Sequence, residues 1–312
     1  MRRFWKSADD SLAGKHPAIS ECPLEKEYDM PFHLKIGTRR VDNKQKTEKN
    51  LSEDEFESFF GLAEVARDNN LSENGIIALY HKMSKAKNDE MSLEHAENYI
   101  RALESINGTA GGGGKVYFQG DSEKRSPLAH YNMTGGSTTT LSKGYYRFVP
   151  SDKNKVFSAG SRINISVHTN KLILLSQIIS DLTLKEKNII QSKIVSPGAI
   201  ENITESAVIY LKGADLYFAE IIAKSIYDKI GADSLLPTKM IGLKMLQTGI
   251  GYKEVSKGDT TSAARSLAKV IGSAISSQPY SKLKSEKNLR KELKAALERR
   301  GYERKNPALR IT

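Results

Sequence analysis

Two segments of the chain carry cationic and amide side chains at positions that a β-sheet would bring together. Residues 162–167 read Arg-Ile-Asn-Ile-Ser-Val, and this strict alternation of polar and apolar residues is typical of a half-buried strand. Its polar face carries Arg162 and Asn164, and a second predicted strand begins at Lys193. Because adjacent strands share faces, we expect Arg162, Asn164 and Lys193 to lie side by side. The expected chemistry is the binding of an anion by a cationic patch on a rigid sheet.

The elements around these residues form a predicted β-α-β-β unit over residues 162–213. After the first strand, apolar residues recur at helical spacing over 172–182, which predicts a helix with one apolar face. Two further strands are predicted over 193–195 and 206–211. If the helix packs on the apolar face of the sheet, the polar face remains free for chemistry.

The rest of the chain predicts an α+β fold in three parts. Residues 1–50 are polar and show no sustained period, which is typical of a flexible leader. Ser52 and Glu55 form a capping box that predicts the start of a helix, and residues 51–110 are predicted to be a helical subdomain. Residues 111–312 are predicted to be an α+β body in which helices pack on a mixed or antiparallel sheet.

Glycine-rich stretches connect several of the predicted elements. Residues 108–120 contain Gly-Gly-Gly-Gly-Lys, but Val116 follows the lysine where a phosphate-binding P-loop needs Ser or Thr. We therefore interpret this stretch as a flexible joint. Residues 121–143 are predicted to be a loop, and residues 248–252 are predicted to be a tight turn.

Composition excludes several classes of protein. The chain has 312 residues, a formal net charge of +11 and one cysteine, Cys22, so we expect neither an internal disulfide framework nor a structural zinc site made of thiolates. No apolar run is long enough to span a bilayer, and the N-terminus lacks the apolar core of a Sec signal peptide. Residues 282–310 hold eleven Lys or Arg against four Glu, which favours an anionic partner.

Seven short segments together carry a family resemblance. They are Tyr-Tyr-Arg-Phe-Val-Pro at 145–150, Arg-Ile-Asn-Ile-Ser-Val at 162–167, Ser-Lys-Ile-Val-Ser-Pro at 192–197, Glu-Ser-Ala-Val-Ile-Tyr at 205–210, Thr-Gly-Ile-Gly at 248–251, Arg-Gly-Tyr at 300–302 and Asn-Pro-Ala-Leu-Arg at 306–310. On these segments and their order, the chain resembles the HopPsyA family of type III secreted effectors, which bacteria inject into host cells. The resemblance runs from about Ser52 to the last residue and is strongest after Tyr145.

The same fold is similar, more distantly, to lyases of peptide biosynthesis that eliminate phosphate from phosphorylated Ser or Thr. This resemblance implies a phosphate site in which Arg162 and Arg265 hold the phosphate through their guanidinium forks. Lys193 would be the base that removes the Cα proton, and flanking arginines and burial would lower its pKa toward the working range. The site needs no metal or organic cofactor. The other implied phosphate-binding residues are Asn164, Thr248, Gly249 and Gly251.

Each of these residues also has a plainer interpretation. An Arg or Lys at the start of a strand is usually only solvated, and Arg162 and Lys193 could be no more than that. Arg265 lies in the first turn of a predicted helix, where a cation opposes the helix dipole, so a further reason for its presence is slightly favoured. Residues 248–252 could form an ordinary turn, and the sequence identifies no general acid.

The sequence and the resemblance together predict a secreted virulence effector that a type III system delivers into the host cell cytoplasm. Its expected activity is elimination of phosphate from phosphothreonine or phosphoserine at a cationic cleft. The expected partners are a phosphorylated host protein and a dedicated secretion chaperone that binds residues 1–50. One alternative is a non-catalytic effector that binds a host signalling protein through its basic surface. Nucleic-acid binding is disfavoured, because the basic C-terminal helix is interleaved with Glu286, Glu292 and Glu298 rather than with aromatic residues.

Overall fold

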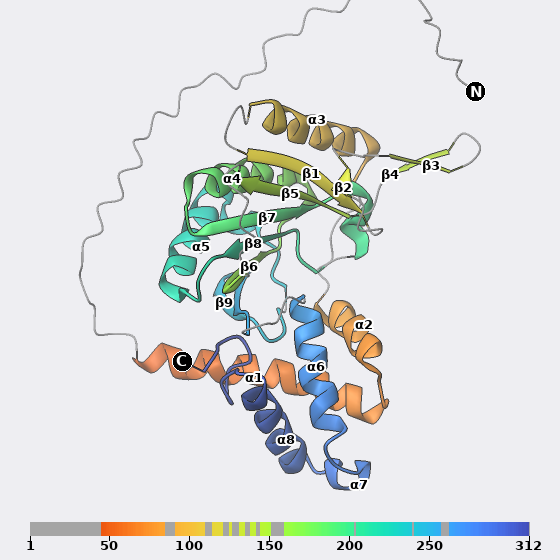
Figure 1. The fold of residues 1–312 in the computed structure, drawn as a ribbon, viewed down its shortest axis with the longest axis vertical. Helices are drawn as coiled ribbons and strands as arrows, with labels where there is room; N and C mark the ends of the chain where they lie inside the picture. Colours follow the sequence, from red (N-terminus) through yellow and green to blue (C-terminus); the bar gives the residue numbers. More distant parts are fainter. Residues whose placement is uncertain are drawn as a thin grey trace, which may run out of the picture. The chain divides into compact units, whose positions relative to one another are not determined.

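The computed structural model of the chain describes helices and strands from Gln45 onward (Figure 1). The predicted leader lies outside the described residues as far as residue 44. Within the described part of the chain, none of the helices has the length and apolar character needed to cross a membrane. The described residues are 45–84, 91–109, 114–120, 125–126, 131–134, 138–141, 144–150, 159–202, 204–238, 240–256 and 262–311.

The strands form one eight-stranded sheet and a separate two-stranded ribbon. The strands are β1 (Gly114–Gly120), β2 (Arg125–Ser126), β3 (Tyr131–Thr134), β4 (Thr138–Leu141), β5 (Gly144–Pro150), β6 (Ser161–Ile165), β7 (Ile189–Val195), β8 (Ala207–Leu211), β9 (Lys244–Gln247) and β10 (Ile250–Glu254). The sheet has the order β2-β1-β5-β7-β8-β6-β10-β9, and its described pairings are all antiparallel. The predicted α+β fold is confirmed. The loop predicted over residues 121–143 is wrong in part, because β2, β3 and β4 lie there.

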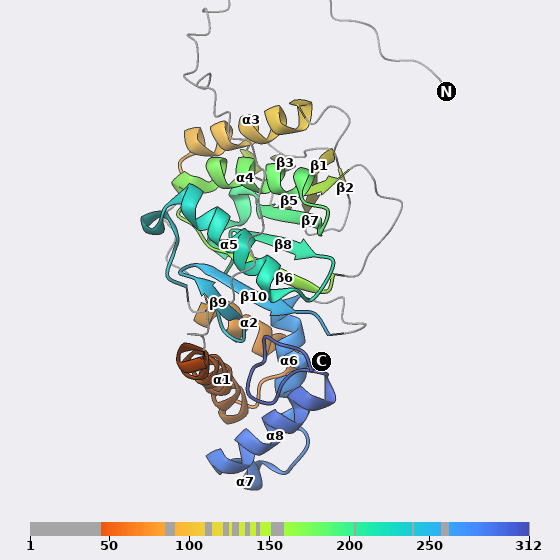
Figure 2. The same ribbon diagram turned by 90° about the vertical axis from the view of Figure 1, so that its left-hand side faces the viewer.

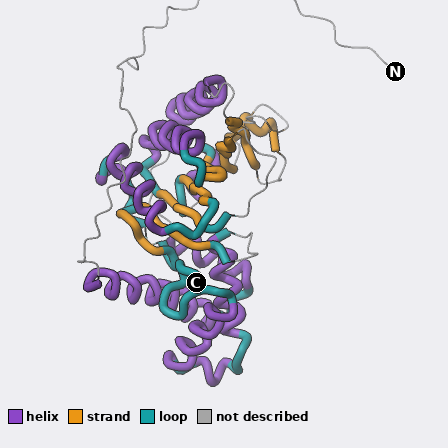
Figure 3. Tube along the Cα trace, turned by 60° about the vertical axis from the view of Figure 1, so that its left-hand side comes forward, coloured by secondary structure: helices purple, strands orange, loops and turns teal. Residues whose placement is uncertain are grey.

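The helices divide between two hydrophobic cores. They are α1 (Gln45–Asp68), α2 (Glu73–Ser84), α3 (Leu93–Thr109), α4 (Leu172–Lys185), α5 (Leu216–Ile230), α6 (Ala263–Ile275), α7 (Tyr280–Leu283) and α8 (Glu286–Arg299), with short 3-10 turns at Thr169–Lys171, Pro197–Asn202 and Ala232–Ser234. Helices α3, α4 and α5 share a core with the sheet, whereas α1, α2, α6 and α8 form a second core. Figure 2 shows these two groups of helices apart from each other, and Figure 3 shows the strands that lie alongside the first group.

The apolar face of the sheet is the one that α4 and α5 cover. On β6, Ile163 and Ile165 are fully buried, and in the register of the sheet they lie opposite Ile209 and Ala207 of β8. All four side chains belong to the core that contains α4 and α5. The alternation in residues 162–167 therefore predicted the apolar face correctly.

The polar face of β6 is also covered, and the expectation that it stays free is wrong. Arg162 is 4% exposed and Asn164 is 3% exposed, so every residue of β6 is buried. Near Asn164 the cover comes from Tyr80 of α2 and from Met240 and Leu243, which precede β9. A half-buried strand needs one solvated face, and the second group of helices removes it here. Any site at Arg162 is therefore enclosed.

The second core depends on helices from both ends of the described chain. Phe59 of α1, Ile76 of α2 and Leu293 of α8 are fully buried in it. Helix α1 begins at Gln45, so Ser52 lies inside the helix and the predicted capping box is wrong. The Gln, Lys and Glu residues before Ser52 have high helix propensity, which lets the helix extend beyond the predicted start.

Helix α3 belongs to the core of the sheet rather than to the second core. Tyr99 and Leu103 are fully buried there, and the Tyr99 hydroxyl donates a hydrogen bond to the carbonyl oxygen of Val195 at 2.9 Å. Helices from residues 51–110 thus contribute to both cores. The division of the chain into domains at residue 110 stays a prediction.

The chain after α8 folds back onto β10, and we call residues 300–311 the C-terminal clasp. Lys253 of β10 is completely buried, donates a hydrogen bond to the carbonyl oxygen of Pro307 and lies 4.2 Å from the centre of the Tyr302 ring. These contacts replace the water that the Lys253 ammonium loses on burial. Without them, burial of this charge would be costly. Further hydrogen bonds join Glu254 to Ala308 and Arg310, and Ser256 to Arg300 and Tyr302.

Replacing Tyr302 by Phe tests how much the clasp stabilises the fold. The Tyr302 hydroxyl lies 3.0 Å from the Ser266 hydroxyl in a buried site, so we expect Tyr302→Phe to lower the free energy of unfolding by about 1–2 kcal/mol. Tyr280→Phe is the matched control, because Tyr280 is 50% exposed and should change stability by less than about 0.5 kcal/mol. Urea unfolding measures both, and equal effects of the two substitutions would contradict the expectation.

Candidate functional site

Two rows of residues cross the sheet on the face opposite to the one that α4 and α5 cover. The first row is Arg147, Lys193, Val208, Asn164 and Gly251, and the second is Gln191, Tyr210, Arg162 and Lys253. We call these residues the polar face. Arg162, Asn164 and Lys193 share it as predicted, but they do not lie side by side, because β8 separates β6 from β7. With strands about 4.8 Å apart, the backbones of Asn164 and Lys193 are about 10 Å apart.

Lys193 is half-buried, and its ammonium lies 3.8 Å from the centre of the Tyr145 ring. Burial lowers the pKa of Lys193. The neighbouring Tyr210, Tyr145 and Glu205 raise the pKa by more than burial and Arg147 lower it, so the pKa lies above its ordinary value. The expected lowering of this pKa is therefore wrong in direction. Lys193 is a protonated cation at neutral pH, which suits the binding of an anion better than the removal of a proton.

Tyr80 of α2 lies at the polar face, where the positive charge of Arg162 affects its pKa. Burial raises the pKa of the Tyr80 phenol far above its ordinary value; Glu205 raises this pKa further, and the positive charge of Arg162 lowers it. Tyr80 is thus a protonated hydroxyl near one carboxylate and one guanidinium. The second group of helices therefore supplies a polar group to the site as well as a cover.

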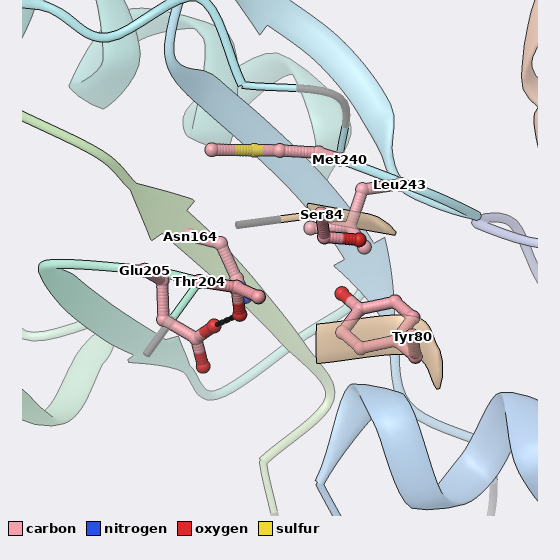
Figure 4. A pocket seen from close by; sticks show the side chains of 7 residues that line it. All are labelled: Tyr80, Ser84, Asn164, Thr204, Glu205, Met240 and Leu243. Carbon is pink, nitrogen blue, oxygen red and sulfur yellow. Dashed lines mark hydrogen bonds between the residues drawn. The ribbon is translucent and has the colours of Figure 1, made fainter. Parts of the chain in front are cut away.

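A small pocket lies against the polar face at Asn164 (Figure 4). Its free space is about that of one water molecule. In Figure 4, Asn164, Thr204 and Glu205 lie together across the pocket from Tyr80, and Thr204 donates a hydrogen bond to the Glu205 carboxylate. Among the described residues, none donates a hydrogen bond to Asn164 Oδ1, which is buried. The residues lining the pocket are Tyr80, Ser84, Asn164, Thr204, Glu205, Met240 and Leu243.

Gly251 allows the pocket to close over Asn164. It lies opposite Asn164 in the register, and a Cβ at this position would come within 2.6 Å of Met240 Sδ and 3.2 Å of Leu243 Cβ. Glycine in a strand marks a place of close approach by other atoms, and here the approaching side chains are Met240 and Leu243. Contact of Gly251 with phosphate stays a prediction.

Gly249 packs the turn between β9 and β10 against the loop that follows β6. Its φ is +70°, and a Cβ would lie 2.8 Å from the carbonyl oxygen of Leu236 and 2.9 Å from that of Ser166. The Gly249 carbonyl accepts a hydrogen bond from the backbone N–H of Ser166 at 2.8 Å. Thr248 is exposed beside it. The structure thus shows a packing role for this turn, and phosphate binding by Thr248 and Gly249 stays a prediction.

Arg265 is exposed in the first turn of α6, where Ser262 caps the helix by accepting the Arg265 backbone N–H at 3.3 Å. Helix α6 packs against α2 and α8. Across the described ranges, no hydrogen bond or ion pair joins the Arg265 guanidinium to the polar face. Convergence of Arg265 with Arg162 and Lys193 on one phosphate therefore stays a prediction.

The sequence reasoning missed the residues that surround Lys193. Tyr145 and Arg147 come from β5, and Glu205 comes from the segment before β8. One signal was present, since Tyr145 and Arg147 alternate with apolar residues in 145–150 and so share a face. Nothing local in the sequence shows that β5 pairs with β7.

Replacing Gly249 by Ala tests the packing role of the turn. An alanine at positive φ is strained, and its Cβ would meet two backbone oxygens that cannot move aside cheaply, so the free energy of unfolding should fall by about 2 kcal/mol or more. Gly272 in α6 is the control, because a Cβ there meets nothing within 4 Å. Gly272→Ala should be neutral or stabilise by up to about 1 kcal/mol. If Gly249→Ala unfolds at the same urea concentration as wild type, the packing role is refuted.

An NMR titration of labelled lysine side chains tests the charge state of Lys193. The pKa of Lys193 should lie above that of free lysine, because a carboxylate and phenol groups face its ammonium. Glu205→Gln should lower the pKa of Lys193, since it removes a negative charge. A pKa of Lys193 below that of free lysine in the wild-type protein would restore the case for a base.

Comparison with known proteins gives matches over much of this structure. The sequence profile of the HopA1 effector protein family matches residues 137–309. Protein HrmA of Pseudomonas syringae pv. syringae is 30% identical over 169 residues, which cover 54% of this chain and 43% of HrmA, so the match spans less than half of that relative.

Solved structures agree with the family match. The effector protein from Pseudomonas syringae pv. tomato strain DC3000 is 25% identical, with 84% of this chain and 100% of that chain covered and a TM-score of 0.71. The type III effector and phosphothreonine lyase OspF from Shigella flexneri is 13% identical, with 51% of this chain and 90% of that chain covered and a TM-score of 0.28. The OspF score is too low to support a conclusion about fold or chemistry. The profile match covers more than half of the chain, and the chain belongs to the HopA1 effector protein family.

Proposed function

We propose that this chain is a type III secreted virulence effector that acts inside the host cell and binds a phosphorylated host protein at its polar face. Membership of an effector family supports the first part of the proposal, and its relatives include effectors of Pseudomonas syringae. Secretion would use a leader over residues 1–50 and a dedicated chaperone. The second part of the proposal depends on the chemistry of the polar face.

The observation that carries the binding proposal is the environment of Lys193. Lys193 is half-buried and lies in the same row as Arg147, its ammonium is protonated at neutral pH, and Arg162 lies enclosed in the second row. Charge-assisted hydrogen bonds from ammonium and guanidinium groups to phosphate oxygens are strong, and partial burial reduces their screening by salt. Arg147 and Lys193 are the partly exposed cations of the polar face, so they are the ones a ligand can reach.

Elimination of the phosphate is the second candidate function. The amine of Lys193 would take the Cα proton of the phosphorylated residue, a Cα–Cβ double bond would form as the Cβ–O bond breaks, and the phosphate would leave with a proton. Tyr145 and Tyr210 lie near Lys193. The phenol of either residue could supply that proton and so act as the general acid, which the sequence alone does not identify. The raised pKa of Lys193 opposes this chemistry, because a base must first lose its proton. The charge state of Lys193 therefore favours binding over elimination.

The basic surface of α8 is a weaker candidate for the binding site. Arg290, near its middle, makes two hydrogen bonds to the carboxylate of Glu57, at 2.6 and 2.7 Å, and one to Glu286 at 2.7 Å. Its guanidinium also lies 3.8 Å from the centre of the Phe60 ring. The charge of Arg290 is thus used within the second group of helices. The exposed lysines that remain are solvated and are screened by salt.

Three substitutions separate binding from elimination. The purified full-length protein is mixed with phosphothreonine peptides, and both affinity and peptide mass are measured. We expect Lys193→Ala to weaken binding about tenfold or more, because one charge-assisted contact is lost, and Lys193→Arg to retain most of the affinity. Lys187→Ala removes the same charge from an exposed position just before β7 and should leave the affinity unchanged.

The peptide mass decides between the two functions. Elimination removes phosphoric acid from the peptide, whereas a phosphatase leaves a hydroxyl in place of the phosphate, so the products differ by one water. Binding alone leaves the mass unchanged. If elimination occurs and both Lys193→Ala and Lys193→Arg abolish it, Lys193 is the base, since arginine keeps its proton. Equal peptide affinity of wild type and Lys193→Ala would refute the proposed binding site.

A further inference from the structure

We propose that Glu205, together with Asn164, selects the anion at this site: it accepts a phosphate group that keeps one proton and rejects a tetrahedral anion that has none, such as sulfate. This inference rests on the proposed binding of phosphate at the polar face. It concerns a different question, namely which anion the cations there will hold. Glu205 and Asn164 place acceptor groups beside the cations.

Glu205 is a carboxylate placed among cations and hydroxyl groups. It lines the pocket with Asn164 and Tyr80, and it accepts a hydrogen bond from the Thr204 hydroxyl, which fixes its orientation. The charged and titratable groups around it come from four elements. Tyr80 of α2, Lys193 of β7 and Tyr145 of β5 interact with Glu205, and Arg162 of β6 interacts with Tyr80.

Asn164 adds a second acceptor that has no donor. Its side chain is 3% exposed and lines the pocket, and within the described ranges its Oδ1 atom has no hydrogen-bond partner. A buried polar atom without a partner costs free energy, and a ligand that brings a donor would remove that cost. A ligand group that enters this pocket is therefore expected to donate a hydrogen bond.

A protonated phosphate meets these requirements and sulfate does not. A phosphate monoester retains a proton in mildly acidic solution, since its second pKa is about 6. Its charged oxygens can face Lys193, which interacts with Glu205, while its P–OH group donates to Glu205 or Asn164. Sulfate has similar size and shape but carries no proton, so whichever of its oxygens enters the pocket would face the carboxylate as a like charge. The pocket has room for about one water-sized group, which matches a single phosphate oxygen rather than the whole anion.

The test compares inorganic phosphate with sulfate in mildly acidic buffer at constant ionic strength. Calorimetry or NMR shift titrations of the full-length protein measure both affinities. We expect wild type to bind phosphate about tenfold or more tightly than sulfate, because one anion gains a charge-assisted hydrogen bond and the other gains a repulsion. In Glu205→Gln the preference should fall close to one, mainly because sulfate binds better.

Two further variants serve as controls. Thr204→Val keeps the charge of Glu205 but removes the hydroxyl that holds it, so the preference should be reduced and not lost. Glu94→Gln removes a charge from an exposed position on α3 and should leave the preference unchanged. Thermal unfolding of each variant confirms that it is folded.

The outcomes separate this inference from the proposed function. If wild type binds phosphate and sulfate equally well, or if Glu205→Gln keeps the wild-type preference, the selection by Glu205 is refuted while phosphate binding stands. If wild type binds neither anion, the proposed function fails and the inference fails with it. Because the first comparison uses the wild-type protein alone, an unfolded variant cannot hide the result.

Discussion

The burial of cations on the polar face of the sheet is the constraint that the rest of the structure must satisfy. Removing a charge from water is costly unless the protein supplies hydrogen bonds or opposite charge. Lys253 obtains both a carbonyl and an aromatic ring from the C-terminal clasp, and Lys193 obtains the Tyr145 ring and the nearby Glu205. Pro307 lies 54 residues from Lys253 in the sequence, and Tyr145 lies on a different strand from Lys193. The clasp, β5 and the segment before β8 are therefore held in place by the same charges that they stabilise.

The sequence predicted the faces of the strands better than their neighbours. The alternation at 162–167 identified which residues of β6 point into the core, because a period of two depends only on local geometry. It could not show that β8 lies between β6 and β7, since strand order is a property of the whole fold. For the same reason the direction of the pKa shift of Lys193 was predicted wrongly. The groups that raise this pKa, Tyr210, Tyr145 and Glu205, are brought near only by strand pairing and by a turn.

Local sequence patterns also could not predict which elements cover the polar face. The sequence predicted a helical subdomain over residues 51–110, but the apolar stripe of a helix does not show which surface it will cover. The stripe of α1 packs with α6 and α8, and the end of α2 delivers Tyr80 to the sheet. Helices α1 and α2 lie outside residues 137–309, the part that matches the family profile. A core tolerates changes of sequence if its volume and apolar character are kept, so such helices can diverge while the packing persists.

The composition of the second core has a consequence for how the chain reaches its folded state. Its first two helices come from residues 45–84 and its last two from residues 263–299. Contacts between such distant segments close a long loop, which is slow and entropically costly. During synthesis, α1 and α2 can pack against each other, but they cannot complete this core until α6 and α8 have left the ribosome. A protein built in this way spends its early life incompletely folded, and that interval is when a factor that binds unfolded chains can capture it.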